Sequence, residues 1–306
     1  MDDILAMLKK FGQIGACFVL LCLLGCDNST EQSYTPSFSN TPTHTNRVYL
    51  FGVHPLHNPL RLFDVFGPLM DYLSQHVVGV SFKLEASRSY AAYDKKLYAQ
   101  RFHFALPNPF QTINAVDRGY NVFAKMGDDE NFRGIILTRK DSGIDLVTDL
   151  KGQAVSYPAP TALAATMMPQ YYLQSHGVDV MTELDNRYVG SQESSIMNVF
   201  LGQTMAASTW PPPWLALSQE RPELKEQLQI KWQTEPLLNN GLVVLPSVPK
   251  RVVKDVTKLM VELHEHEPGR RILKRMGLSR FEVADNAVYQ PVRDFIKIFS
   301  QKVRPL

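Results

Sequence analysis

The sequence predicts an α/β protein of two lobes, each with a mainly parallel sheet flanked by helices. Residues 47–110 alternate between strand and helix patterns in the order βαβαβ. A second series of strands begins near residue 134, and a further apolar strand returns near residue 241. The chain would then cross between the lobes twice, near 133–140 and 231–241, which predicts a hinge.

In the first lobe, strands and helices follow from hydrophobic periodicity. Ligands bind at the carboxyl ends of strands in open α/β sheets, so the loops 54–59 and 107–110 are expected at the rim of a site. The expected strands are 48–53, 80–84 and 102–106, and the expected helices are 62–73, 93–99 and one starting at Gln111.

The second lobe is predicted from strands that end in short loops. The strand at 205–210 is expected to stop at three prolines, Pro211 to Pro213. The expected strands are 134–138, 154–157, 186–189 and 205–210, and the expected helices are one from Thr161, 194–201 and 220–228. Strand 241–245 and helices 252–264 and 289–302 complete the first lobe, so we assign 47–135 with 241–306 to lobe 1 and 136–240 to lobe 2.

Composition fits a folded globular protein with room for two domains. The chain has 306 residues, of which 44% are hydrophobic and 20% charged. Its formal net charge of +2 gives no basis for a nucleic-acid partner. All three cysteines, Cys17, Cys22 and Cys26, lie in the first 26 residues. The body of the chain therefore has no cysteine for a disulfide, a metal site or a nucleophile.

The N-terminus carries a targeting pattern. Residues 11–24 are almost entirely apolar, follow two lysines and are too short for a comfortable membrane span. Residues 23–26, Leu-Leu-Gly-Cys, resemble a bacterial lipobox. The resemblance implies a signal peptide of residues 1–25, cleavage before Cys26 and lipidation of Cys26. An uncleaved short anchor is the alternative.

Residues 26–46 are predicted to be a tether. They are rich in Ser and Thr and poor in aliphatic residues, so they cannot bury a core. A flexible tether of this length would span roughly 25 Å. Asp27 and Asn28 resemble an inner-membrane retention signal, which implies anchoring on the periplasmic side of the inner membrane.

Residues 134–166 organise the rest of the chain. A strand at 154–157 leads through Pro158-Ala159-Pro160 into an Ala-rich helix that starts at Thr161. The first N–H groups of a helix have no internal partner, and the helix dipole adds partial positive charge, so such an end binds oxyanions well. The alternative is that Thr161 only caps the helix.

Four stretches of the chain form a recognisable set: residues 141–157, DSGIDLVTDLKGQAVSY, residues 169–177, PQYYLQSHG, the triplet Val189-Gly190-Ser191, and residues 289–293, YQPVR. This set resembles the phosphate, phosphite and phosphonate receptors of ABC transporters. The resemblance implies the type 2 periplasmic binding protein fold. It also implies capture of a small anion between the lobes and delivery to an ABC permease.

The resemblance also implies where the anion is held. Hydroxyls and amides at the helix start after the second-lobe strand would bind it, and loops of the first lobe would complete the cage. Three of the residues expected to contact the ligand have structural alternatives. Asn108 could only form a turn, Phe110 could only pack in the core, and Trp210 could only pack at the hinge. The expected ligand residues are Thr161, Ala162, Leu163, Tyr157, Asn108, Phe110, Ser191, Gln192 and Trp210.

Three departures from the family pattern bear on the ligand. At the helix start only Thr161 keeps a hydroxyl. Gln192 stands where such receptors typically carry a histidine, and an amide cannot be cationic. Met205 stands where they often carry an acidic residue, which disfavours an aminoalkyl phosphonate. The ligand is therefore expected to differ from the family's usual one.

The sequence also bears on three other functions: a sensor receptor, a metal-binding protein and an enzyme. A sensor receptor of the same fold, signalling to a membrane protein, is the alternative to transport. His54 with His57, and His264 with His266, have chelating compositions, but the first pair lies on a proline-broken loop and the second faces different sides of a helix. No Walker loop, G-x-S-x-G or H-E-x-x-H motif occurs. We therefore expect no enzyme, no cofactor and no metal.

Overall fold

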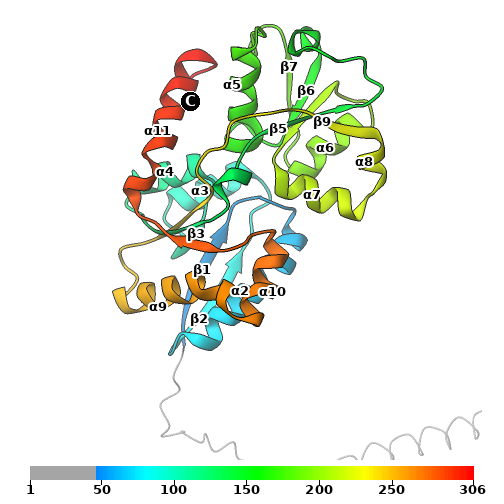
Figure 1. Cartoon of the computed structure of the whole chain (residues 1–306). Helices are drawn as coiled ribbons and strands as arrows, with labels where there is room; N and C mark the ends of the chain where they lie inside the picture. Colours follow the sequence, from blue (N-terminus) through cyan, green and yellow to red (C-terminus); the bar gives the residue numbers. More distant parts are fainter. Residues whose placement is uncertain (1–45) are drawn as a thin grey trace, which may run out of the picture. The chain divides into compact units, whose positions relative to one another are not determined.

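Two sheets organise residues 46–306, the part of the chain that the computed structural model describes (Figure 1). One sheet has six strands in the order β11-β4-β10-β3-β1-β2, and the other has five in the order β7-β6-β8-β5-β9. We call the first sheet with its helices lobe 1 and the second lobe 2. The predictions for the signal peptide, Cys26 and most of the tether lie outside the described residues.

Lobe 1 is a mixed sheet with helices from both ends of the chain. Strand β1 pairs in parallel with β2 and β3, whereas β10 pairs antiparallel with β3 and β4, and β11 antiparallel with β4. Its strands are β1 (Arg47–Val53), β2 (Val80–Glu85), β3 (Phe104–Leu106), β4 (Asn121–Met126), β10 (Gly241–Val244) and β11 (Phe281–Val283). Its helices are α2 (Pro59–His76), α3 (Tyr90–Tyr98), α4 (Pro109–Val116), α9 (Lys250–Val261) and α10 (Glu267–Met276), with short turns η4 (Glu262–Glu265) and η5 (Asn286–Tyr289).

Lobe 2 is also mixed. Strand β6 pairs in parallel with β7 and β8, and β5 pairs antiparallel with β8 and β9. Its strands are β5 (Ile135–Arg139), β6 (Ala154–Tyr157), β7 (Asp185–Tyr188), β8 (Ala206–Thr209) and β9 (Leu228–Gln233). Its helices are the π-type turn η3 (Leu163–Met167), which runs directly into α5 (Met168–Ser175), then α6 (Gln192–Phe200), α7 (Pro211–Glu220) and α8 (Glu223–Gln227), with a short turn η2 (Val147–Leu150).

The two lobes are joined by two crossings and by the last helix. The first crossing runs from β4 through η1 (Asp129–Asn131) to β5, and the second runs from β9 to β10. Helix α11 (Gln290–Lys302) packs against α4 of lobe 1 and α5 of lobe 2 (Figure 1). After it, Arg304 donates to the carbonyl oxygen of Pro160 at 2.6 Å. The C-terminal segment therefore contacts both lobes.

The buried core is continuous from one lobe to the other. The aromatic core of lobe 1, with Phe51 and Phe104 stacked at 6.2 Å between ring centroids, extends to residues 162–168 and Trp210 of lobe 2. Two smaller clusters fill lobe 2 on the two faces of its sheet. Apolar surface from both lobes is thus removed from water together, which stabilises the closed arrangement.

The two-lobed α/β fold predicted from the sequence is confirmed, with two local differences. Each sheet is mixed rather than mainly parallel, because the strands on either side of a crossing run antiparallel to their neighbours. The three prolines do end β8, but they also begin α7, since proline fits the first turn of a helix. The helix predicted at 220–228 is only the short α8.

Between residues 46 and 306, no helix combines the length and the apolarity needed to cross a membrane.

Candidate functional site

A small pocket lies where the two lobes meet. Lobe 1 contributes residues that follow β1 and begin α3 and α4, lobe 2 contributes the start of η3, α6 and α7, and both crossings contribute one residue each. Its volume is about 10 Å³, which is room for a single water molecule. The lining residues are His54, Tyr90, Asn108, Phe132, Ala162, Leu163, Ala164, Ala165, Gln192, Trp210 and Asn240.

Three peptide N–H groups at the start of η3 are available to a ligand. Thr166 and Met167 both donate their amides to the carbonyl of Ala162, at 2.9 and 3.2 Å. Within the described residues, the amides of Leu163, Ala164 and Ala165 find no acceptor. All three residues line the pocket. The wide first turn therefore leaves a row of unpaired donors at a helix N-terminus, an arrangement suited to an oxyanion.

Gly134 allows this turn to lie close to the first crossing. A Cβ atom at position 134 would lie 2.6 Å from the carbonyl oxygen of Ala164 and 2.5 Å from Cγ of Pro169. Both distances are too short for any side chain. Glycine at this point of the hinge thus fixes the position of the unpaired amides.

His54 contributes an acceptor from lobe 1. Its Nδ1 lies 2.9 Å from the carbonyl oxygen of Leu106, which can only accept, so Nδ1 carries the proton. Burial lowers the pKa of His54 to about 4, although the hydrogen bond to Leu106 acts in the opposite direction. The ring is therefore neutral near pH 7, and Nε2 has a free lone pair.

Tyr90 and Gln192 form a donor pair across the lobes. Thr209 donates its hydroxyl to Oε1 of Gln192 at 2.8 Å, which fixes the amide and directs Nε2 to the Tyr90 hydroxyl at 3.4 Å. Burial raises the pKa of Tyr90, so its hydroxyl stays protonated. Because the hydroxyl oxygen accepts from Gln192, its own proton can be donated to a ligand.

Asn108 joins the lobes beside the pocket. Its Oδ1 accepts from the amide of Gln111 at 3.0 Å and caps α4, while Nδ2 donates to the carbonyl of Thr161 at 3.0 Å. Thr161 thus meets lobe 1 through its backbone. The opposite wall is aromatic, with the rings of Phe132 and Trp210 in edge-to-face contact at 5.5 Å.

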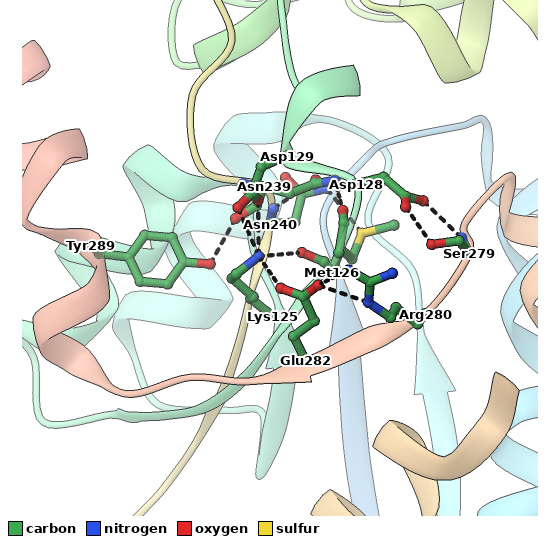
Figure 2. A network of polar contacts seen from close by, with 11 residues as sticks. Lys125, Met126, Asp128, Asp129, Asn239, Asn240, Ser279, Arg280, Glu282 and Tyr289 are labelled. Atoms are coloured by element: carbon green, nitrogen blue, oxygen red, sulfur yellow. Dashed lines mark hydrogen bonds and ion pairs between the residues drawn. The ribbon is translucent and has the colours of Figure 1, made fainter. Parts of the chain in front are cut away.

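Asn240 completes the pocket from the second crossing. Its side chain is fully buried, and its Oδ1 has no hydrogen-bond partner in the described part of the chain. Its backbone is fixed by a polar network, in which Met126 donates its amide to the Asn240 carbonyl at 2.9 Å (Figure 2). Lys125 sits at the centre of that network, with Nζ 2.9 Å from Asp129 and 2.8 Å from Glu282.

The pocket is uncharged. Among the described residues that line it, none is Lys, Arg, Asp or Glu. Across residues 46–306, no group of three or more His, Cys, Asp and Glu side chains is arranged to hold a metal ion. Any ligand charge must therefore be balanced by peptide dipoles and neutral donors.

The structure brings some of the predicted ligand residues to this pocket and places others elsewhere. Ala162, Leu163, Asn108, Gln192 and Trp210 line it. Their contact with a ligand stays a prediction.

The remaining predicted residues have other surroundings. Tyr157 is buried in the core of lobe 2, where its ring lies 5.9 Å from that of Tyr188. Phe110 is partly buried against the core of lobe 1. Ser191 caps α6 by accepting from the amide of Ser194 at 3.0 Å. Thr161 contributes its carbonyl to Asn108.

The predicted ligand residues leave out six of the lining positions, which are His54, Tyr90, Phe132, Ala164, Ala165 and Asn240. His54 was considered only as a metal ligand, although it follows β1 in a loop expected at the rim. Phe132 and Asn240 lie in the crossings, where no motif marks them. The adjacent polar residues Asn239 and Asn240, just before a buried strand, were the available signal.

Two sheets, two crossings and unpaired amides in the pocket between them define a two-lobed solute-binding protein. The chain belongs to the family of periplasmic substrate-binding proteins of phosphonate ABC transporters, whose family model matches residues 51–289. No curated protein matches the sequence.

Solved structures of similar proteins show the same fold. A binding protein component of an ABC phosphonate transporter from Pseudomonas aeruginosa is 19% identical with a TM-score of 0.77, covering 84% of this chain and 88% of that one. PhnD1 from Prochlorococcus marinus, solved with methylphosphonate, is 17% identical with a TM-score of 0.77, covering 84% and 99%. The aliphatic sulphonate binding protein SsuA from Escherichia coli is 13% identical with a TM-score of 0.55, covering 84% and 85%.

Proposed function

We propose that the protein is the lipid-anchored solute-binding component of an ABC importer and binds a small oxyanion in its interlobe pocket. Phosphate, phosphite and small phosphonates are the candidate ligands. The observation that carries the proposal is the row of unpaired amides at Leu163, Ala164 and Ala165, which faces a pocket between two lobes. Membership of the phosphonate receptor family supports the same ligand class.

The pocket offers enough donors for such an anion. Three peptide N–H groups, the Tyr90 hydroxyl and the Gln192 amide can each donate to an oxyanion oxygen. Hydrogen bonds to charged groups contribute about 1.5–3 kcal/mol each. The walls of Phe132 and Trp210 exclude water, which strengthens every one of these contacts.

Capture requires the lobes to separate and close again. The pocket holds about 10 Å³, so an anion larger than one water enters only when the lobes move apart. The closed arrangement would then present one surface made of both lobes to the permease. A ligand that binds only between the lobes shifts the population toward this closed form.

The anchor would hold the protein beside its permease. Lipidation at Cys26 and the tether of residues 26–46 place the body on the periplasmic side of the inner membrane. Mass spectrometry of the mature protein should find a diacylated or triacylated N-terminal Cys26. An unmodified or uncleaved N-terminus would contradict this part of the proposal.

A thermal-shift series tests the ligand class. The protein is titrated with phosphate, phosphite and methylphosphonate, and a ligand at a hundredfold excess over its Kd should add about 2.7 kcal/mol to the free energy of unfolding. No stabilisation by any of the three would contradict the proposal.

A matched pair of variants tests the amides. Leu163→Pro and Leu163→Ala both lose the buried leucine side chain, but only proline also loses the N–H. Proline fits this first helical position, since Ala162 before it is extended with ψ 103°. We expect Leu163→Pro to bind at least tenfold more weakly than Leu163→Ala, because one charge-assisted hydrogen bond is lost. Equal affinities would remove Leu163 from the site.

A further inference from the structure

The buried carbonyl oxygen of the Asn240 side chain has no partner. Its residue is 0% exposed, and Oδ1 accepts no hydrogen bond from any described residue. An unsatisfied buried acceptor costs roughly 1–3 kcal/mol, so such a group needs a reason. Asn240 lines the interlobe pocket, and the reason can therefore be a donor on the ligand.

The Asn240 backbone is held in place at both polar atoms. Its amide donates to Oδ1 of Asn239 at 2.8 Å, and its carbonyl accepts from Met126 at 2.9 Å. Asn239 is fixed in turn, because its Nδ2 donates to the carbonyl of Gly127 at 2.7 Å and its own carbonyl accepts from Tyr289 at 2.7 Å (Figure 2). The backbone that carries the Asn240 side chain is thus preorganised.

The orientation of the Asn240 amide follows from its one contact. Nδ2 lies 3.4 Å from the sulfur of Met126, which is only an acceptor. The nitrogen therefore belongs on the Met126 side, and the oxygen is the atom left without a donor. Figure 2 shows the two side chains together.

His54, which also lines the pocket, offers a second acceptor. Nδ1 of His54 is committed as a donor to Leu106, so Nε2 is an acceptor with no partner among the described residues. The pocket thus combines unpaired donors on lobe 2 with unpaired acceptors on lobe 1 and in the crossing. A fully deprotonated oxyanion satisfies the donors and is repelled by the acceptors.

We propose that the pocket selects an oxyanion that still carries a proton, and that Asn240 Oδ1 accepts the ligand O–H. The ligand class is then the monoanion of a phosphonate or phosphite, with one P–OH group, or of phosphate, with two. Sulfonates and sulfate have no such proton near neutral pH and are excluded. This inference rests on the proposed function, because it names the protonation state of the anion bound there.

Two ligands of equal shape test the inference. Methylphosphonate monoanion and methanesulfonate have the same tetrahedral form and the same charge, and they differ by one proton. Both are titrated calorimetrically into the wild-type protein at one mildly acidic pH. Because a site built for a ligand hydroxyl rejects the analogue without it strongly, we expect methylphosphonate to bind at least ~100-fold more tightly.

Variants of Asn240 assign the effect to its side chain. Asn240→Leu keeps a branched side chain but has no acceptor, so methylphosphonate should bind more weakly and the preference should fall at least tenfold. Asn240→Asp keeps an acceptor and should retain the preference, while its negative charge weakens the binding of both anions. Thr138→Val is the matched control, because it removes another buried polar atom without a partner, a hydroxyl outside the pocket, and should leave the preference unchanged.

The outcomes separate the two proposals. If neither anion binds to the wild type, the proposed function fails. If both bind with similar affinity, or if Asn240→Leu keeps the full preference with an unchanged unliganded melting temperature, the oxyanion site stands and the proton-selective role of Asn240 is overturned.

Discussion

Arg61 of α2 and Glu220 of α7 form an ion pair of 2.8 Å that joins lobe 1 to lobe 2. Asn58 reinforces it with a 3.3 Å contact to Glu193 of α6. These groups lie outside the pocket lining, while the Asn108–Thr161 contact lies beside the pocket and involves the lining residue Asn108. The closed form is therefore held by polar contacts at the rim as well as by the ligand site.

Removing the rim ion pair should weaken ligand binding without touching the pocket. An exposed ion pair contributes about 0.2–1 kcal/mol, so Arg61→Gln should raise the Kd about 1.4- to 5-fold by favouring the open form. The effect should shrink at high salt, because ions screen exposed charges. Calorimetric titration at two salt concentrations measures it. Arg251→Gln is the control, since Arg251 pairs with Asp255 inside α9. A similar loss of affinity in this variant would contradict a role of the Arg61–Glu220 ion pair in holding the lobes closed.

A negative charge at position 108 should abolish most of the affinity for an anion. Asn108→Asp keeps an oxygen to cap α4 but loses the donor to Thr161 and puts a carboxylate at the pocket wall. We expect more than a hundredfold loss of anion affinity, because like charges at close range in a dry site repel strongly. The unliganded melting temperature should also fall, because an unpaired carboxylate is buried at position 108 even though the cap remains. A variant that still binds the anion with wild-type affinity would exclude a ligand near Asn108.

The sequence alone predicts the lobes, the hinge and the helix start at the pocket, but only part of the lining. The unpaired amide of Leu163 is predictable because a helix start after a strand is a local feature, whereas the amide of Ala162, also expected to bind, donates to the carbonyl of Ala159 at 3.2 Å. Asn240 is not, since it meets the pocket only when β10 inserts between β3 and β4 of a sheet whose other strands lie far away in sequence. The acceptor role of His54 depends on the carbonyl of Leu106, a contact that no local pattern encodes.

Tyr157 illustrates the opposite case. Val155 and Tyr157 are two positions apart in β6, so their side chains point to the same face of the sheet, and both lie in the core of lobe 2. Strand alternation was therefore enough to place Tyr157 in the core.

His57 should make the fold sensitive to acid. Burial, followed by the charges of Arg61 and His54, lowers the pKa of His57 to about 3 from an ordinary 6.5. Between these values the unfolded chain binds a proton that the native state does not, so stability is lost as pH falls through this window. Urea unfolding of wild type and His57→Gln from pH 7 to 4 checks this. The variant should gain relative stability as pH falls, and a constant difference would contradict the buried neutral ring.

The Lys125 network should link hinge stability to ligand affinity. Burial alone would lower the pKa of Lys125, but hydrogen bonds to Glu282 and Asp129 and their charges raise it, so the ammonium is retained. Lys125→Met would leave both carboxylates, Asp129 of the first crossing and Glu282 of β11, without this partner. Because the carboxylates are partly exposed, we expect a loss of about 1–3 kcal/mol, less than for a fully buried pair. Urea unfolding measures it.

Lys125→Met should also weaken ligand binding. Asp129 accepts from the Asn239 amide at 2.9 Å, and Asn239 holds Asn240 in turn, so a displaced Asp129 disturbs the pocket acceptor. We expect methylphosphonate to bind about tenfold more weakly, since a preorganised acceptor becomes mobile. Arg280→Gln is the control, because Arg280 also pairs with Glu282 but contacts neither Asp129 nor Asn239. If Lys125→Met lowers stability and leaves affinity at the wild-type value, Asn240 is positioned independently of the network.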